Sequence, residues 1–132
     1  MNEPVLIISY DELKILLYNR GFRSCSGILM PEKEYTQEEI LQIMNKLALR
    51  GLIEAKEEHF VIPPQVAQTA DLIGAPQSSY SFSDPETGQV YCCYISDTLV
   101  VVTEKNWARK DTLRIRRFTP LEFSEWGNEI GV

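Results

Sequence analysis

The sequence has few of the residues that most often carry chemistry. It contains three cysteines and a single histidine in 132 residues. An odd number of cysteines, in a chain without an export signal, argues against a disulfide framework and for reduced thiols. Structural zinc needs four Cys or His ligands, so every cysteine and His59 would have to converge on one point. We therefore expect no disulfide scaffold, no metal site and no cofactor.

Catalytic signatures are also missing from the sequence. It has no GxSxG, GxGxxG, P-loop or HExxH motif. Cys92 and Cys93 are neighbours in an expected strand, so their side chains should point to opposite faces. His59, the one histidine that could activate a nucleophile, stands beside Glu57 and Glu58 at an expected hairpin tip, where it reads as a surface residue. We expect a protein that is not an enzyme.

Long apolar runs are absent too. No stretch approaches the roughly 18 residues of a membrane-spanning helix. The opening letters MNEPVLIISYDE show neither a positively charged region nor a small-residue cleavage site. These features predict a cytoplasmic protein that does not insert into membranes.

The composition is that of a globular chain. It is 44% hydrophobic and 24% charged, with 7 Gly and 7 Pro, which suits one domain over residues 1–132 with a real core. The formal net charge of −6 makes nucleic acid and anionic membrane unfavourable partners.

Three helices are expected in the first part of the chain, about residues 1–76. Ser9 with Glu12, and Thr36 with Glu39, have the spacing of capping boxes. Each is followed by an apolar stripe at helical spacing, while Pro64 suits a first helical position. The predicted elements are helices over 10–20, from Thr36 to Gly51 and over 64–73, with a short hairpin formed by 52–55 and 60–62. No pairing strand is predicted for the apolar run Val5–Ile8.

The second part, about residues 77–132, changes to the period of strands. Its elements form a four-stranded antiparallel meander and a short last helix, so the fold class is α+β. The run Leu99–Val102 does not alternate, and we expect it to be covered on both faces, by a helix or by a second subunit. The predicted strands are 79–83, 90–95, 99–103 and 112–118, and the last helix follows a third capping box at Thr119 with the apolar stripe Phe123, Trp126 and Ile130.

Positive charge is concentrated in one segment. Residues 105–117 contain six basic residues and one acid, in a chain that is otherwise strongly acidic. One interpretation is a solvated loop and strand face balanced by the acidic body. The other is a docking patch, because an aromatic residue flanked by arginine is typical of interface hot spots. Trp107 could instead cover the edge of the core. The candidate partner-binding residues are Lys105, Trp107, Arg109, Lys110, Arg114 and Arg116.

Residues 36–62 resemble the last helix and wing of winged-helix domains. The letters LALRGLI close a helix and lead into a hairpin. A recognition helix presents its N-terminal residues to DNA, and here these are Gln37, Glu38 and Glu39. The hairpin tip Lys56–His59 also carries two glutamates. DNA binding is therefore the alternative function rather than the first.

A second resemblance covers residues 5–118. The stretches SYDELKIL at Ser9, LALRGL at Leu47 and LIGAP at Leu72, followed by the strands from Gly88 to Val100, resemble EspG-type chaperones of type VII (ESX) secretion. The resemblance implies a cytosolic chaperone or adaptor that holds a small helical secretion substrate. Full-size members have two similar halves and this chain supplies one, so a homodimer is expected to supply the other. No binding residue transfers by motif.

Overall fold

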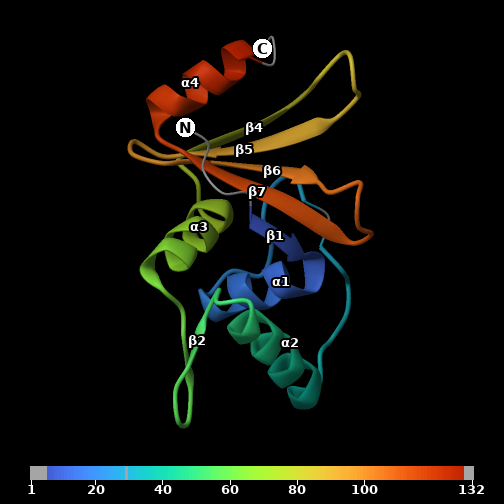
Figure 1. Ribbon diagram of the computed structural model, residues 1–132, viewed down its shortest axis with the longest axis vertical. Helices are drawn as coiled ribbons and strands as arrows, with labels where there is room; N and C mark the ends of the chain where they lie inside the picture. Colours follow the sequence, from blue (N-terminus) through green and yellow to red (C-terminus); the bar gives the residue numbers. More distant parts are fainter. Residues whose placement is uncertain (1–5, 29, 130–132) are drawn as a thin grey trace.

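The computed structural model describes residues 6–28 and 30–129 and shows an α+β fold (Figure 1). Helices α1 to α3 lie on one side of a five-stranded sheet and α4 lies on the other. In chain order the elements are β1 (Leu6–Ser9), α1 (Tyr10–Asn19), α2 (Gln37–Leu49), β2 (Glu54–Ala55), β3 (Phe60–Val61), α3 (Pro64–Gly74), β4 (Ser78–Ser83), β5 (Val90–Ile95), β6 (Val100–Lys105), β7 (Thr112–Phe118) and α4 (Pro120–Glu129).

The predicted helices begin where their capping signals stand. At α1 the Ser9 hydroxyl accepts from the Glu12 amide at 3.0 Å, and the Glu12 carboxylate accepts from the Ser9 amide at 2.8 Å. The same reciprocal pair forms at α2 between Thr36 and Glu39. A third joins Thr119 to Glu122 at the start of α4. Each box satisfies amides that have no partner within the helix, which fixes the start of the helix.

The predicted meander forms β4 to β7, and β1 joins it as a fifth strand. All neighbours are antiparallel, in the order β1-β7-β6-β5-β4. The run that the sequence left without a partner pairs with the far end of the chain, with Leu6 opposite Ile115 and Ile8 opposite Leu113. The small hairpin β2–β3 forms separately, as predicted.

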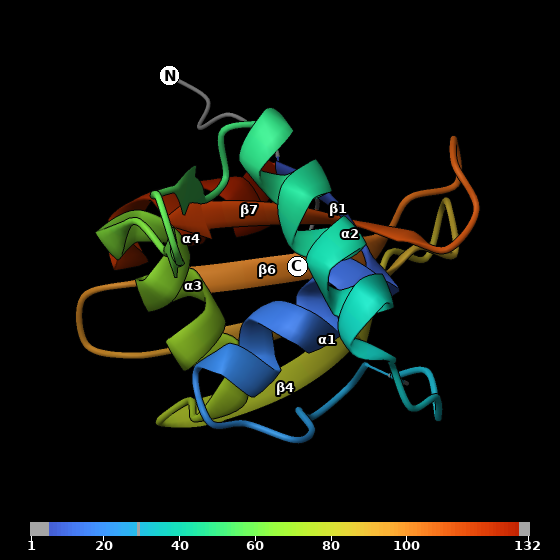
Figure 2. The same cartoon turned by 90° about the horizontal axis from the view of Figure 1, so that it is seen from below.

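A large core lies between the sheet and the first three helices (Figure 2). We call this side of the sheet the helical face; among its residues are Cys92, Tyr94, Val101, Leu113 and Ile115, all packed in this core. The helices contribute their apolar stripes, and Leu13, Leu47 and Ile73 are all 2% exposed or less.

A smaller cluster covers the opposite side of the sheet, which we call the α4 face. Tyr91, Cys93, Val100 and Val102 are buried there beneath Phe123 and Trp126 of α4. The expectation that Leu99–Val102 is covered on both faces is confirmed for Val100, Val101 and Val102, and the cover is a helix of the same chain. A second subunit is therefore not needed to bury this strand. Ile130, predicted to extend the stripe of α4, lies outside the described residues.

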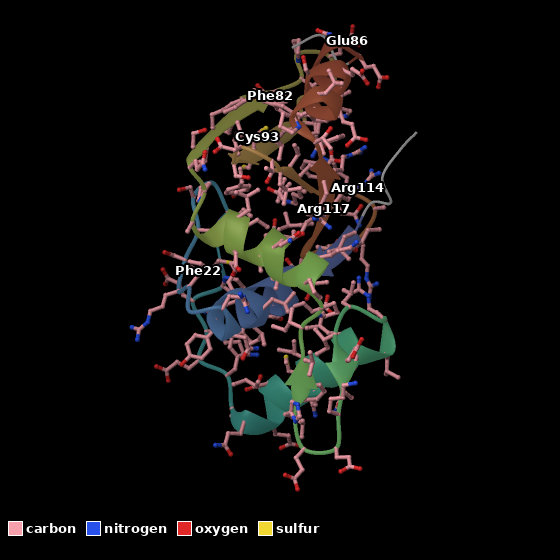
Figure 3. The ribbon with its side chains drawn as sticks, turned by 90° about the vertical axis from the view of Figure 1, so that its left-hand side faces the viewer. Phe22, Phe82, Glu86, Cys93, Arg114 and Arg117 are labelled. Carbon is pink, nitrogen blue, oxygen red and sulfur yellow. The ribbon has the colours of Figure 1, made fainter. Side chains whose placement is uncertain are left out.

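Gly74 allows close packing between α3 and the segment after α1. A Cβ atom at this position would fall inside van der Waals contact with the ring of Phe22. Figure 3 shows Phe22 among the helices, while Phe82 and Cys93 lie higher, in the part of the sheet next to α4. The two hydrophobic clusters are thus separated by the sheet itself.

Candidate functional site

The loop between β6 and β7 is held in one shape by buried polar contacts. Asn106 is 6% exposed, and its side chain donates to the Thr112 hydroxyl at 3.1 Å and accepts from the Ala108 amide at 3.2 Å. The Thr112 hydroxyl donates in turn to the Arg109 carbonyl at 2.6 Å. Asp111 has a positive φ of 59°, and its carbonyl accepts from the Tyr10 amide. A short polar loop is thereby tied to β7 and to the start of α1.

Trp107 projects from this loop into solvent. It is 72% exposed, so the alternative that it covers the core edge is not what the structure shows. The Lys105 ammonium lies 4.6 Å from the centre of its ring, within the range of a cation–π contact. Its Nε1 donates to the Gln89 side chain, whose own Nε2 donates to the Lys105 carbonyl at 3.1 Å. The indole is exposed but held by Lys105 and Gln89, so little side-chain freedom remains to be lost on binding.

Arg109 and Lys110 stand at the exposed tip of the same loop. They line an open groove of about 400 Å³ together with Ser9, Asp11 and Pro31. In Figure 1 this loop and the β4–β5 turn project from the same end of the sheet. We call Lys105, Trp107, Arg109 and Lys110 the loop surface.

Arg114 and Arg116 do not join the loop surface. They lie on the α4 face, where their guanidinium groups are directed at the Glu104 carboxylate, at 3.8 Å and 2.9 Å respectively. The Glu104 side chain is only 7% exposed, so its charge is compensated inside the fold. The six candidate residues therefore form two groups, of which only the loop surface is free of a carboxylate partner among the described residues.

Gln89 and Glu104 were missed as relevant residues. Gln89 follows a turn and has no local signal that it would hold a tryptophan from another hairpin. Glu104 had a usable signal, because it extends the predicted strand 99–103 and pairs in register with Arg114 and Tyr91 of its neighbours. A buried acid between arginine-bearing positions is a cross-strand pair, and the register could have indicated it.

The thiols and the histidine do not gather into one site. Cys92 and Cys93 face opposite sides of the sheet, as predicted: Cys92 Sγ lies 3.3 Å from the Gly27 carbonyl, and Cys93 is buried on the α4 face. Burial raises the pKa of Cys25 and of Cys93 to about 11. His59 is exposed at the β2–β3 tip. Within residues 6–28 and 30–129 no three His, Cys, Asp or Glu side chains gather in a way that could hold a metal ion.

Comparison with known proteins leaves the geometry as the basis for function: no protein-family model matches the chain, and no curated protein matches it. Among the described segments, none of the helices has the length and apolar character needed to cross a bilayer.

Proposed function

We propose that this chain is a non-catalytic protein-binding module that engages its partner through the loop surface. The observation that carries the proposal is Trp107, an exposed indole held by Gln89 and Lys105. Tryptophan is strongly enriched in binding hot spots, and an aromatic anchor fixed before binding loses little entropy when the partner arrives.

The charges around Trp107 favour an acidic partner. Lys105 lies over its ring and Arg109 and Lys110 follow in the same loop, while Glu104 compensates one of the two positive charges of Arg114 and Arg116 on the sheet. A positive rim on an acidic protein steers an acidic partner to this place and repels it elsewhere.

The resemblance to EspG-type chaperones supports a more specific form of the proposal. In this form the protein is a cytosolic chaperone or adaptor, and its partner is a small helical substrate of type VII secretion. An acidic helix would meet the basic rim with its charges and Trp107 with its apolar positions.

A winged-helix role in DNA binding is the alternative. The β2–β3 hairpin that follows α2 supports it by shape. The carboxylates of Glu38 and Glu39 at the start of α2, and of Glu57 and Glu58 at the exposed tip, would face phosphates. The protein-binding proposal has no such electrostatic cost.

The test uses a purified small helical WXG-type protein from the same genome as the probe. We expect Trp107→Ala to weaken its binding by about tenfold or more, the loss typical of a hot-spot residue. Tyr18→Ala is the matched control, because Tyr18 is an aromatic residue 64% exposed on α1, away from the loop surface. Titration calorimetry measures both.

Two results would contradict the proposal. The first is absence of binding to the helical probe. The second is equal affinity for the Trp107→Ala and Tyr18→Ala variants. Duplex DNA at low salt is measured in parallel, and binding that falls steeply with added salt would favour the winged-helix alternative.

A further inference from the structure

The two edges of the five-stranded sheet differ in how their backbone groups are satisfied. At the β1 edge, the Tyr10 amide donates to the carbonyl of the opposite residue, Asp111. Because hydrogen-bonded pairs alternate along antiparallel strands, Ile7 and Ser9 direct their backbone groups away from β7. The Ile7 carbonyl accepts from Arg50, and the Ser9 amide donates to the Glu12 carboxylate. Side chains therefore bind one outward backbone group of each of these two residues.

The β4 edge is open. The Asp84 amide donates to the Gln89 carbonyl at 2.9 Å, which places Ser79, Ser81 and Ser83 with their backbone groups directed away from β5. Within the described part of the chain, none of these outward groups makes a backbone hydrogen bond. The nearby segment at Ser26 and Gly27 binds Tyr94 and Cys92 of β5 instead. Figure 2 shows β4 as the outermost strand on its side.

Strand β4 also lacks the features that usually protect an edge. Natural sheets block open edges with charged side chains, proline, a bulge or a covering segment. The β4 sequence SSYSFS has no charge and no proline, and its six residues pair with β5 in an unbroken register. All of its residues except Phe82 are exposed.

We propose that β4 pairs with β4 of a second copy of this chain, antiparallel, with Ser81 on the two-fold axis. In this register Ser81 faces its own counterpart and Ser79 faces Ser83 of the other copy. These are the positions whose backbone groups point outward, so each pair can exchange two hydrogen bonds. The two sheets become one continuous ten-stranded sheet.

The side chains of β4 fit a second copy. Tyr80 and Phe82 lie on the α4 face, and in this register Tyr80 of each copy stands opposite Phe82 of the other. Tyr80 is 46% exposed although its ring centre is 6.1 Å from that of Phe82, which packs on Trp126. Pairing would continue this aromatic cluster across the axis.

Charge does not oppose this pairing. The first acid beyond β4 is Asp84, which would face the uncharged Ser78 of the second copy. No two like charges stand opposite each other along the strand, although each chain has a net charge of −6. The one pocket described beside β4 is small, about 130 Å³, and has no charged residue in its lining, so it offers a foreign peptide little that would select it. A second copy is therefore the occupant that β4 itself specifies.

Solution mass by light scattering tests the pairing. We expect the protein to have twice its 15.1 kDa chain mass at micromolar concentration. Ser81→Pro removes the outward amide at the axis. It removes no hydrogen bond of the folded chain, because this amide points away from β5, and proline is tolerated on edge strands. This variant should have the circular dichroism spectrum of the folded protein and the mass of a monomer by light scattering. Ser81→Ala keeps the amide and should remain a dimer.

Cross-linking tests the register independently of Ser81→Pro. Variants are made in a Cys92→Ala background, because Cys92 lies directly opposite Ser81 within one chain. With diamide as the oxidant, Ser81→Cys should form a disulfide-linked dimer, since paired Cα atoms are about 5.5 Å apart. Ser79→Cys alone should not, because its two copies are offset by about 13 Å along the strand. A mixture of Ser79→Cys and Ser83→Cys should cross-link.

Three outcomes would overturn the proposal. One is a monomer at every concentration, which leaves the edge for a foreign strand or for none. Another is a dimeric protein whose mass is unchanged by Ser81→Pro and whose Ser81→Cys variant does not cross-link. The third is cross-linking of Ser79→Cys to itself, which would require a different register.

Discussion

At the scale of single residues, Arg50 joins three elements of the fold. It follows α2, and its guanidinium binds both oxygens of Glu12 at 2.8 and 3.0 Å and also the Ile7 carbonyl. Glu12 in turn caps α1. One arginine thus joins α2, the start of α1 and the outer edge of β1.

Removing this arginine should destabilise the protein. We expect Arg50→Ala to lower the free energy of unfolding by about 1–3 kcal/mol, because the Glu12 carboxylate, 8% exposed, would be left without its cation. Urea denaturation measures the change.

Arg20→Ala is the matched control for Arg50→Ala. Arg20 pairs with Asp71 at 2.8 Å, but both side chains are more than a third exposed. An exposed pair contributes about 1 kcal/mol or less. Equal losses for the two variants would show that burial of Glu12 does not set the strength of the pair.

At the scale of elements, α4 depends on aromatic contacts. None of its described residues is fully buried, yet the Trp126 ring lies 5.2 Å, centre to centre, from both Phe118 and Tyr91. One ring is stacked and the other meets its edge, which are the favoured geometries for aromatic pairs. The helix is therefore attached to the sheet mainly by one side chain and its neighbours.

Trp126→Ala should loosen α4 and uncover the α4 face. We expect a loss of about 2–4 kcal/mol in the free energy of unfolding, somewhat below that of a fully buried tryptophan. Binding of the dye ANS should rise as the aromatic surface becomes accessible. Leu121→Ala, in the same helix at a position 70% exposed, should change neither quantity. Unchanged dye binding in Trp126→Ala would contradict this role of the ring.

At the scale of the whole molecule, burial affects the weak acids that titrate at alkaline pH. Burial is the main cause of a raised pKa at all three thiols and at five tyrosines. For Cys25 and Cys93 the pKa rises to about 11, and the other groups are Cys92, Tyr10, Tyr35, Tyr80, Tyr91 and Tyr94.

We expect the free energy of unfolding to fall as the pH rises from about 8.5 to 11. In the unfolded chain thiols ionise near pH 8.5 and phenols near pH 10, so the unfolded state loses its protons first and gains stability. Urea titrations at several pH values, with a reductant present, measure the slope. Cys93→Ala should make it shallower. Constant stability over this range would contradict burial as the cause.

The sequence predicted the structural elements whose interacting residues lie close together along the chain, and not the contacts between residues far apart in it. The boxes at Ser9, Thr36 and Thr119 were recognisable because both partners lie within four residues, and the meander because its hairpins are local. The pairing of β1 with β7 joins opposite ends of the chain through a very short strand. The contacts of Arg50 with Glu12 also depend on tertiary packing, which no local pattern encodes.

The candidate site followed the same rule. The sequence identified the basic segment and the polar loop that holds Trp107, but left open whether Trp107 covers the core edge. It did not separate Lys105, Arg109 and Lys110 from Arg114 and Arg116, because that division depends on Glu104 of the neighbouring strand. Charge counted along the chain does not show which charges are already compensated across a sheet.

The partly occupied edge at β1 works against the growth of a larger assembly of this chain. A sheet with two open edges can add copies at both ends and grow into a fibre. Here Arg50 binds the Ile7 carbonyl and Glu12 binds the Ser9 amide, so within residues 6–28 and 30–129 β4 is the more open edge of the sheet. In two chains joined through β4, the outer edges are the partly occupied β1 strands, which disfavours the addition of further copies. The arginine that fastens α2 to α1 thus also protects the protein against polymerisation.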